Sequence, residues 1–256
     1  MQEAGQSWSR EGAVVWVDDV EITVAAHDWA FASAHERAIE AHWLRRKAAN
    51  PRFFNGTVHL MRNLAVEDGR LTAHCFPTEF RNYLYWRDMR GPDASVIDGF
   101  GSALVVSADG GILVARQQPG FINTGLYYPP GGFIDQRDVT PDRQVDIVGS
   151  VLREVEEETG LSPDVLAQGR KFAVTRLLAS TGPMASISLV LRSRLPAEEL
   201  RREIRAHLAS ESEPELDDVL FVKTSADLAR LPVAEYCVPL FADLLGSDFL
   251  TRDTAL

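Results

Sequence analysis

Three glutamates near the end of a predicted helix are the residues in this sequence whose types and spacing could do chemistry. Glu154, Glu157 and Glu158 stand at positions i, i+3 and i+4, so on a helix their Cβ atoms lie about 5–6 Å apart. Like charges at this spacing destabilise a helix by about 0.2–0.5 kcal/mol per pair, and the helix dipole disfavours anions in the last turn. One interpretation is a solvated acidic face. The other is a site for Mg²⁺, which takes oxygen ligands and keeps waters that meet substrate phosphates.

The helix that must position these glutamates is predicted to be long. Thr140 is expected at its N-cap and Pro141 in its first turn, because both residue types are favoured there. Gly160 is expected to end it, as glycine commonly does just past a helix. At about 100° per residue, an apolar stripe that faces the core is formed by Val148, Leu152, Val155 and Thr159.

The same run resembles a known sequence motif. Residues 153–161, Arg-Glu-Val-Glu-Glu-Glu-Thr-Gly-Leu, match every defined position in the second half of the Nudix box, Gly-x5-Glu-x7-Arg-Glu-U-x-Glu-Glu-x-Gly-U, where U is a bulky apolar residue. Pro130-Gly131-Gly132 resembles the start of the box, with Gly132 as its first glycine. The resemblance implies an α+β fold, an α/β/α sandwich around a mixed sheet in which the box forms a strand, a loop and a helix.

The resemblance also implies roles for individual residues. Glu154, Glu157 and Glu158 would bind Mg²⁺ or Mn²⁺ together with a backbone carbonyl near Gly132, and Arg153 would orient the carboxylates. Arg153, Glu154 and Glu157 are thus the candidate catalytic residues, with Glu157 as the general base. The implied reaction is attack of an activated water on a phosphorus of a diphosphate linkage. A general base from outside the box is the alternative, and the acids available are Glu211, Glu213 and Glu215.

The sequence departs from the box pattern in two ways. Asp138 stands where the box has its first Glu, and 14 residues instead of seven separate it from Arg153. Seven extra residues are close to two helical turns, so they either lengthen the helix backwards or form a larger loop around residues 136–144.

The first third of the chain is predicted to be a separate α+β unit. All five Trp lie in the first 86 residues, and large aromatics dominate burial in a core. We expect an N-terminal extension over residues 1–98 and a Nudix hydrolase domain over residues 99–256, divided near Gly91-Pro92-Asp93. The extension is expected to hold strands at 13–18, 57–64 and 69–76, a helix at 33–47 capped by Ser33, with Ile39, Trp43 and Leu44 on one face, and a helix at 80–89. The second unit is expected to hold strands at 102–107, 112–116, 172–178, 186–191 and 219–222 and helices at 197–208 and 238–245.

Composition narrows the possible partners. Lys and Arg total 26 against 37 Asp and Glu, a net charge of −11, and such a surface repels nucleic-acid phosphates and anionic lipids. Two cysteines, Cys75 and Cys237, are too few for a disulfide scaffold. With no secretory signal in residues 1–12 and no apolar run of about 20 residues, we expect a cytoplasmic protein with a small-molecule substrate. The sequence leaves its oligomeric state open.

The substrate is the least determined feature. Arg116 is a candidate to hold a phosphate bidentately, or it pairs with an acid at the surface. Tyr127 and Tyr128 either stack on a base or alternate in burial within a strand. Residues 50–56 and 80–84 resemble the N-terminal extension of an animal Nudix branch that splits UDP-glucose and UDP-galactose into UMP and a hexose 1-phosphate. The alternatives are ADP-ribose, a dinucleotide or coenzyme A as substrate, or a non-catalytic nucleotide-binding module.

Overall fold

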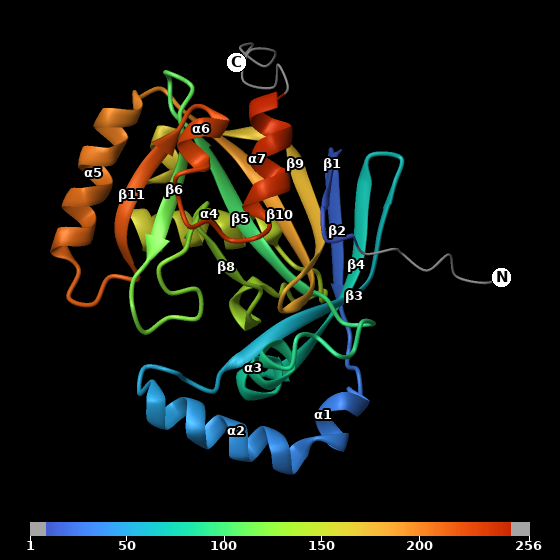
Figure 1. The fold of residues 1–256 in the computed structure, drawn as a ribbon. Coiled ribbons are helices and arrows are strands. Elements are labelled where there is room, and N and C mark those ends of the chain that lie inside the picture. The colour runs from blue at the N-terminus through green and yellow to red at the C-terminus, as the bar shows by residue number, and fades with distance from the viewer. Residues whose placement is uncertain (1–8, 247–256) are drawn as a thin grey trace.

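A mixed sheet of eight strands is the central feature of the computed structural model, which describes residues 9–246 (Figure 1). The strand order is β1-β9-β10-β5-β6-β11, with β7 paired to β6 and β8 paired to β5. Strands β5 and β10 are parallel, and the other neighbours are antiparallel. The strands are β1 (Ala13–Val17), β5 (Asp98–Val106), β6 (Ile112–Gln117), β7 (Tyr127–Tyr128), β8 (Gly131–Phe133), β9 (Leu166–Ala179), β10 (Gly182–Ser193) and β11 (Leu216–Val222).

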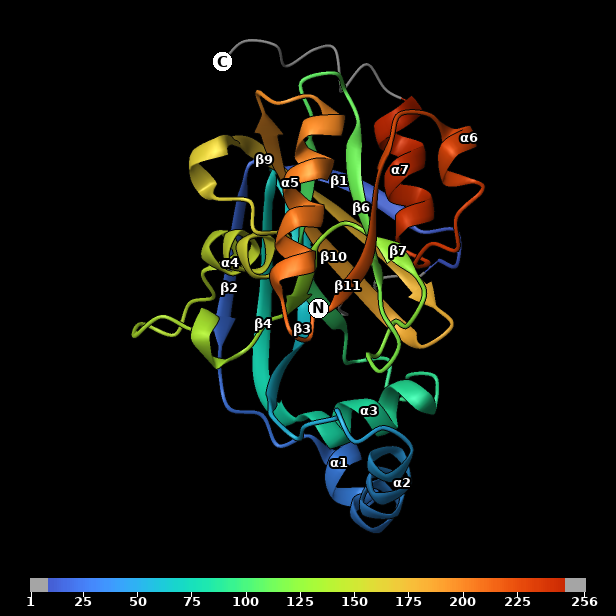
Figure 2. The same ribbon diagram turned by 90° about the vertical axis from the view of Figure 1, so that its left-hand side faces the viewer.

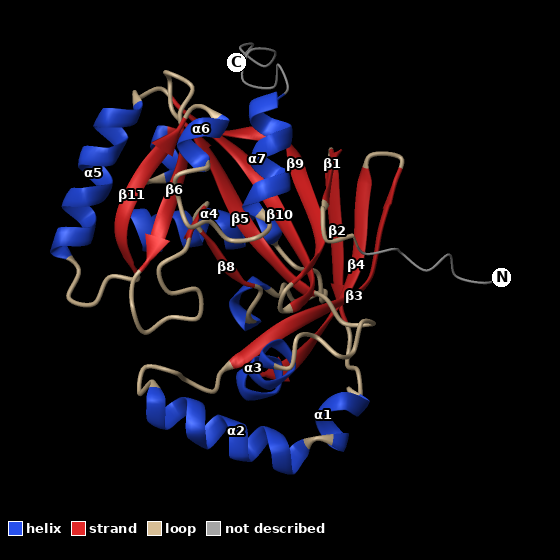
Figure 3. Cartoon of the chain, viewed as in Figure 1, coloured by secondary structure: helices blue, strands red, loops and turns tan. Residues whose placement is uncertain are grey.

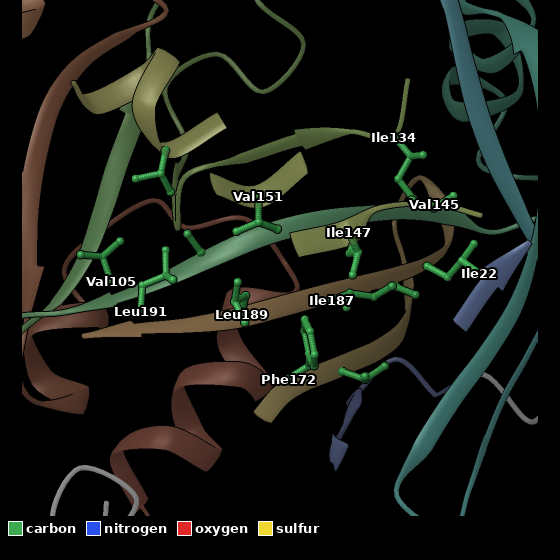
Figure 4. Close-up of a cluster of buried hydrophobic side chains, with 14 of the residues drawn as sticks. Ile22, Val105, Ile134, Val145, Ile147, Val151, Phe172, Ile187, Leu189 and Leu191 are labelled. Atoms are coloured by element: carbon green, nitrogen blue, oxygen red, sulfur yellow. The ribbon is translucent and has the colours of Figure 1, made fainter. Parts of the chain in front are cut away.

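Alternating side chains of the central strand β5 face two separate cores. Ala103 and Val105 belong to the core beneath α4 (Ile147–Thr159) and α5 (Ala197–Ser210), which Figure 4 shows from inside. Leu104 and Val106 belong to the core beneath α7 (Cys237–Gly246) on the opposite face. Because side chains of a strand alternate between the faces of its sheet, the apolar run at 103–106 requires cover on both sides. The predicted α/β/α sandwich around a mixed sheet is therefore confirmed.

The N-terminal residues build a smaller layer in which the strands lie beside the large sheet and the helices lie below it (Figures 1 and 2). Its three-stranded sheet has the order β2-β4-β3, and a turn at Asp68-Gly69, with both residues at positive φ, joins β3 to β4. Trp29 and Trp86 are buried here, whereas Trp8 lies outside the described residues. The elements are β2 (Asp19–Val24), α1 (Ala30–Ala34), α2 (Glu36–Ala49), β3 (Thr57–Glu67), β4 (Arg70–Glu79) and α3 (Phe80–Asp88).

The two parts of the chain share structure across the predicted division. Strand β1 pairs with β9 in the large sheet, and Ile22 of β2 packs into the core beneath α4 (Figure 4). Met61 of β3 forms a bridge with Ile97, immediately before β5. The division between residues 98 and 99 stays a prediction, and the contacts across it are extensive.

Two predicted helices begin elsewhere in the structure. The helix expected from Ser33 is split at His35, and Ser33 caps neither α1 nor α2. Ile39 is buried as expected, but Leu44 is 61% exposed, because α2 packs with α3 through a narrower face that includes His42. The helix expected from Thr140 begins at Ile147, with Asp146 as its N-cap; its predicted end at Gly160, which adopts φ 69°, is confirmed.

Short helical segments connect some of these elements, and one of them, α6 (Ser225–Leu228), is labelled in the ribbon coloured by secondary structure (Figure 3). Cys75 and Cys237 are free and buried. Among the described residues, no helix has the length and apolar character needed to span a membrane. The other short segments are η1 (Gln136–Asp138) and η2 (Pro163–Val165).

Candidate active site

The box helix α4 is held at both ends by its own sequence. The Asp146 side chain accepts a hydrogen bond from the backbone N–H of Gly149 at 2.9 Å, and Gly160 ends the last turn in the left-handed conformation that glycine tolerates. Val155 and Thr159 face the core as predicted. This register buries Glu158, which is 7% exposed, and leaves the Glu157 side chain 51% exposed.

The extra residues of the box form a loop, not two added helical turns. After η1 the chain turns at Thr140, whose N–H donates to the Gln144 carbonyl, and Val139 bridges to Val145. The loop then returns, because the Asp146 N–H donates to the Asp138 carbonyl at 2.8 Å. Seven additional residues are thus accommodated outside the helix, and Asp138 stays beside the start of α4.

Arg153 is the centre of an ion-pair network that includes the acid before the loop. One terminal nitrogen lies 2.7 Å from Asp138 Oδ1, and the other lies 2.7 Å from Glu154 Oε1 and 3.3 Å from Glu157 Oε2. Arg137 also reaches Glu157, at 3.2 Å. Asp138 is buried and pairs with Arg153. These contacts hold Arg153 against Glu154 and Glu157, and its role in orienting the carboxylates stays a prediction.

Three carboxylates meet at the inner end of the box, and only two of them belong to it. Burial is the main cause that raises the pKa of Glu158 well above its ordinary value, and the neighbouring Glu215 and Glu154 raise it further. Burial also raises the pKa of Glu154 to about 7, despite Arg153, with Glu157 and Glu215 adding to the rise. Burial likewise raises the pKa of Glu215, which accepts a hydrogen bond from Gln117. Repulsion among buried carboxylates is relieved by protons or by a cation.

The donor set fits a hard divalent cation. Mg²⁺ and Mn²⁺ prefer carboxylate and carbonyl oxygens, and Glu154, Glu158 and Glu215 offer carboxylates of raised pKa beside the Gly131-Gly132 backbone. The Gly131 N–H donates to Glu158 Oε2 at 3.1 Å. A Cβ added to Gly132 would meet Glu154 Oε2 at 2.6 Å, so only glycine lets that carboxylate approach the backbone so closely. Within residues 9–246, no three His, Cys, Asp or Glu side chains already have metal-site spacing.

Of the other residues predicted to take part in the site, only some lie near the box. Glu211 and Glu213 are exposed, whereas Glu215 of the same loop lies at the site. Arg116 pairs with Asp217 at 2.6 Å and lies over the ring of Tyr127, away from the box, so its position gives no support to the predicted phosphate contact. Both tyrosines of β7 are buried.

A cavity of about 300 Å³ lies next to the box, and sequence reasoning did not foresee its composition. Tyr128, Gly131, Gly132 and Glu215 line it on the side of the box. Its opposite side comes from the N-terminal region, from both segments that resemble the extension of the nucleotide-sugar branch. These residues are Arg52, Phe53, Phe54, Phe80 and Tyr83. No spacing rule connects them, since the tertiary fold alone brings residues 52 and 132 together.

Comparison with known proteins identifies the domain. The NUDIX domain family matches residues 99–232, just over half of the chain. No curated protein matches. Similar solved structures include a Nudix hydrolase from M. smegmatis, RenU, with 15% identity, 62% of this chain and 88% of that chain covered, and a TM-score of 0.42. A C. elegans Ap4A hydrolase binary complex has 13% identity, 59% and 99% coverage and a TM-score of 0.37.

A third similar structure is a bifunctional NMN adenylyltransferase/ADP ribose pyrophosphatase from Francisella tularensis, complexed with AMP and Mn ion. It has 20% identity, 64% coverage of this chain and 46% of that chain, and a TM-score of 0.42. Identities this low compare the fold only, so the assignment rests on the domain match together with the box residues. The chain therefore belongs to the Nudix domain family, as a Nudix-type pyrophosphohydrolase.

Proposed function

We propose that this protein hydrolyses the diphosphate linkage of a nucleoside diphosphate joined to a second group, with Mg²⁺ or Mn²⁺, and that its substrate is a nucleotide sugar. The observation that carries the proposal is the position of the box. Gly131 and Gly132, which lie against the box carboxylates Glu158 and Glu154, line a cavity large enough for part of a small-molecule ligand. In the specific reaction, water and UDP-hexose give UMP and hexose 1-phosphate, and this choice rests on the resemblance of residues 50–56 and 80–84.

The residues of the chain would divide the work as follows. Glu154, Glu157 and Glu158, with the carbonyl of Gly132, hold the cation, and Arg153 fixes the first two carboxylates through its ion pairs. When bound, the cation supplies a water of lowered pKa and neutralises charge that develops on phosphoryl oxygens. Glu157 is the base within the box. The buried position of Glu215 beside Glu158 supports the alternative that this loop supplies the base.

The test is a substrate panel with and without EDTA. UDP-glucose, UDP-galactose, ADP-ribose, diadenosine tetraphosphate and coenzyme A are incubated with Mg²⁺ or Mn²⁺, and the products are resolved by anion-exchange chromatography. We expect the UDP-hexoses to be cleaved fastest, to two monophosphates, and EDTA to abolish turnover. Faster cleavage of another compound would replace the nucleotide-sugar assignment, and no cleavage of any would favour a nucleotide-binding module.

Variants connect the turnover to the box. Glu158→Gln and Glu157→Gln should each lower kcat by about 10²-fold or more, because each removes a carboxylate charge from the site. Glu156→Gln is the matched control, since Glu156 lies on the same helix, is exposed and takes no part in the site. Turnover that persists in both box variants would exclude the proposed use of these carboxylates. If the loop supplies the base, Glu215→Gln should lower kcat, whereas Glu213→Gln, which changes an exposed residue of the same loop, should leave kcat unchanged. Equal kcat values in the two variants would show that Glu215 is not the base.

We also propose that the protein has no nucleic-acid or membrane partner, because a net charge of −11 repels phosphates and anionic lipids. The cytoplasmic location stays a prediction.

A further inference from the structure

The cavity beside the box is largely aromatic. Phe80 and Phe133 meet edge to face with ring centroids 6.1 Å apart, and Tyr83 meets Phe133 in the same way at 5.0 Å. Phe54 contributes to the lining although it is 78% exposed. Large apolar side chains are costly to leave in water, and a flat ring bound in the cavity would shield Phe54 from it.

One buried polar atom in this lining has no partner. Asp98, the first residue of β5, is 6% exposed and lines the cavity. Its Oδ2 accepts a hydrogen bond from the buried hydroxyl of Tyr83 at 2.7 Å. Its Oδ1 is buried and has no hydrogen-bond partner within residues 9–246. A buried acceptor without a donor costs free energy, and a ligand that brings an N–H into the cavity would remove that cost.

Four other polar side chains of the lining, Gln117, Glu215, Asn123 and Arg87, are joined to one another, and Arg52 lies over the Phe121 ring. Gln117 donates from Nε2 to Glu215 and accepts at Oε1 from the N–H of Asn123. Asn123 accepts at Oδ1 from Arg87 at 2.9 Å. A hexose would bring several hydroxyls that lose water and need partners here. A flat aromatic group with one N–H needs only stacking surface and one acceptor.

We propose that this cavity binds the nucleobase of the substrate, and that Asp98 Oδ1 selects among bases by accepting a hydrogen bond from a ring or exocyclic N–H. This inference rests on the proposed function for the identity of the ligand as a nucleotide. Gly131 and Gly132 line the cavity and also lie against the carboxylates of Glu158 and Glu154. A base in the cavity therefore places the attached diphosphate beside these carboxylates. The second group of the substrate then extends away from the cavity.

Binding of products that cannot be hydrolysed tests the inference without using catalysis. Calorimetric titrations in EDTA compare the 5′-monophosphates of uracil, cytosine, adenine and guanine with ribose 5-phosphate, which has no base. We expect one base to bind at least about 10-fold more tightly than ribose 5-phosphate. Equal binding of all five compounds would overturn the inference.

Variants then assign the selection to Asp98. Asp98→Asn keeps the shape of the side chain but can turn an N–H toward the ligand, so we expect about a 10- to 100-fold loss for the preferred base and a changed order of bases. Asp88→Asn is the matched control, because Asp88 pairs with His42 and Arg46 and does not line the cavity. An unchanged order of bases in Asp98→Asn would show that Asp98 is structural and would overturn its assigned role.

Phe54→Ala keeps the test independent of any folding defect in the Asp98 variant. Phe54 is exposed, so its removal should leave the unfolding temperature unchanged while the preferred base binds about 10-fold more weakly. Leu44→Ala removes a similarly exposed apolar side chain, 61% exposed and outside the cavity, and should change neither. If base-dependent binding persists while no compound in the substrate panel is cleaved, the proposed function fails and the base site stands.

Discussion

At the scale of single residues, the site is defined by charges that the fold holds in an unfavourable state. Glu158 is buried and the Glu154 side chain is largely buried, both lie near Glu215, and burial raises the pKa of all three. The positive charge of Arg153 offsets only part of the repulsion among these carboxylates, because Arg153 also pairs with Asp138. A cation that binds the ionised carboxylates would stabilise the folded state, because it binds that state and not the unfolded chain.

The raised pKa of Glu154, about 7 against an ordinary 4.5, predicts how stability depends on pH. The folded state without metal holds this proton more tightly than the unfolded chain does. Its contribution to the free energy of unfolding is therefore fully present below about pH 4.5 and is lost as pH rises through 7. In EDTA, Glu154→Gln should gain stability relative to wild type between pH 5 and pH 8, by roughly 1–3 kcal/mol. Urea unfolding at both pH values measures this difference.

Mg²⁺ should act in the opposite sense, because it binds the ionised carboxylates. The rise in unfolding temperature that saturating Mg²⁺ causes should be larger at pH 8 than at pH 5, and Glu156→Gln should behave as wild type. A Mg²⁺ effect of equal size at both pH values would contradict the ionisation that we assign to the site.

At the scale of elements, the seven added residues of the box do not change helix α4, because they form a loop that ends before the helix begins. The loop over residues 139–146 is fixed at its base by the hydrogen bond between Asp146 and Asp138, and it also joins the N-terminal region. The Val24 N–H donates to the Arg143 carbonyl, and the Val145 N–H donates to Ile22, both at 2.8 Å. The loop is therefore an ordered connection between the box and β2.

Asp146 is the residue that starts α4, so its loss should weaken the helix. Asp146→Ala should lower the free energy of unfolding by about 0.5–2 kcal/mol, because an N–H in the first turn loses its acceptor. Asp146→Ser should retain most of the stability, since serine also caps helices. Equilibrium urea unfolding of the two variants checks this, and a serine variant as unstable as the alanine variant would count against the capping role.

At the scale of the whole molecule, the N-terminal region and the Nudix domain are built into one another. β1 is a strand of the large sheet, and Met61 of β3, which is fully buried, bridges to Ile97. Gly99 lies at this junction, and a Cβ added there would meet Met61 Sδ at 2.5 Å. The cavity also needs both parts, because its lining comes from residues on both sides of the junction.

Gly99→Ala should therefore destabilise both parts together. Overpacking of this kind costs about 1–3 kcal/mol. Trp29 and Trp86 are buried in the N-terminal layer, whereas Trp16 lies in β1 of the large sheet. In a Trp16→Phe background, tryptophan fluorescence therefore reports mainly on the N-terminal region, while turnover reports on the Nudix domain. Thermal loss of both signals should coincide in this background and shift equally when Gly99→Ala is added. Two separate transitions would show that the parts unfold independently and would support the division at residue 98.

The sequence by itself predicted the chemistry of the site and determined much of the fold. The glutamates of α4, Gly132 and the helix end at Gly160 follow from a local motif, and the strands follow from apolar runs of the expected length. Local signals misplaced both helix starts, because Thr140 and Ser33 are good capping residues that tertiary contacts place in a turn and within a short helix instead.

Only the tertiary structure decided which distant residues complete the site. Glu215 joins the box because β11 begins beside β6, and Asp98 meets Tyr83 because α3 packs below the start of β5. A residue pattern records periodicity along the chain, whereas these contacts depend on how strands and helices far apart in the sequence pack together. Burial, which raises the pKa values of the carboxylates and leaves Asp98 Oδ1 without a partner, is a property of that packing.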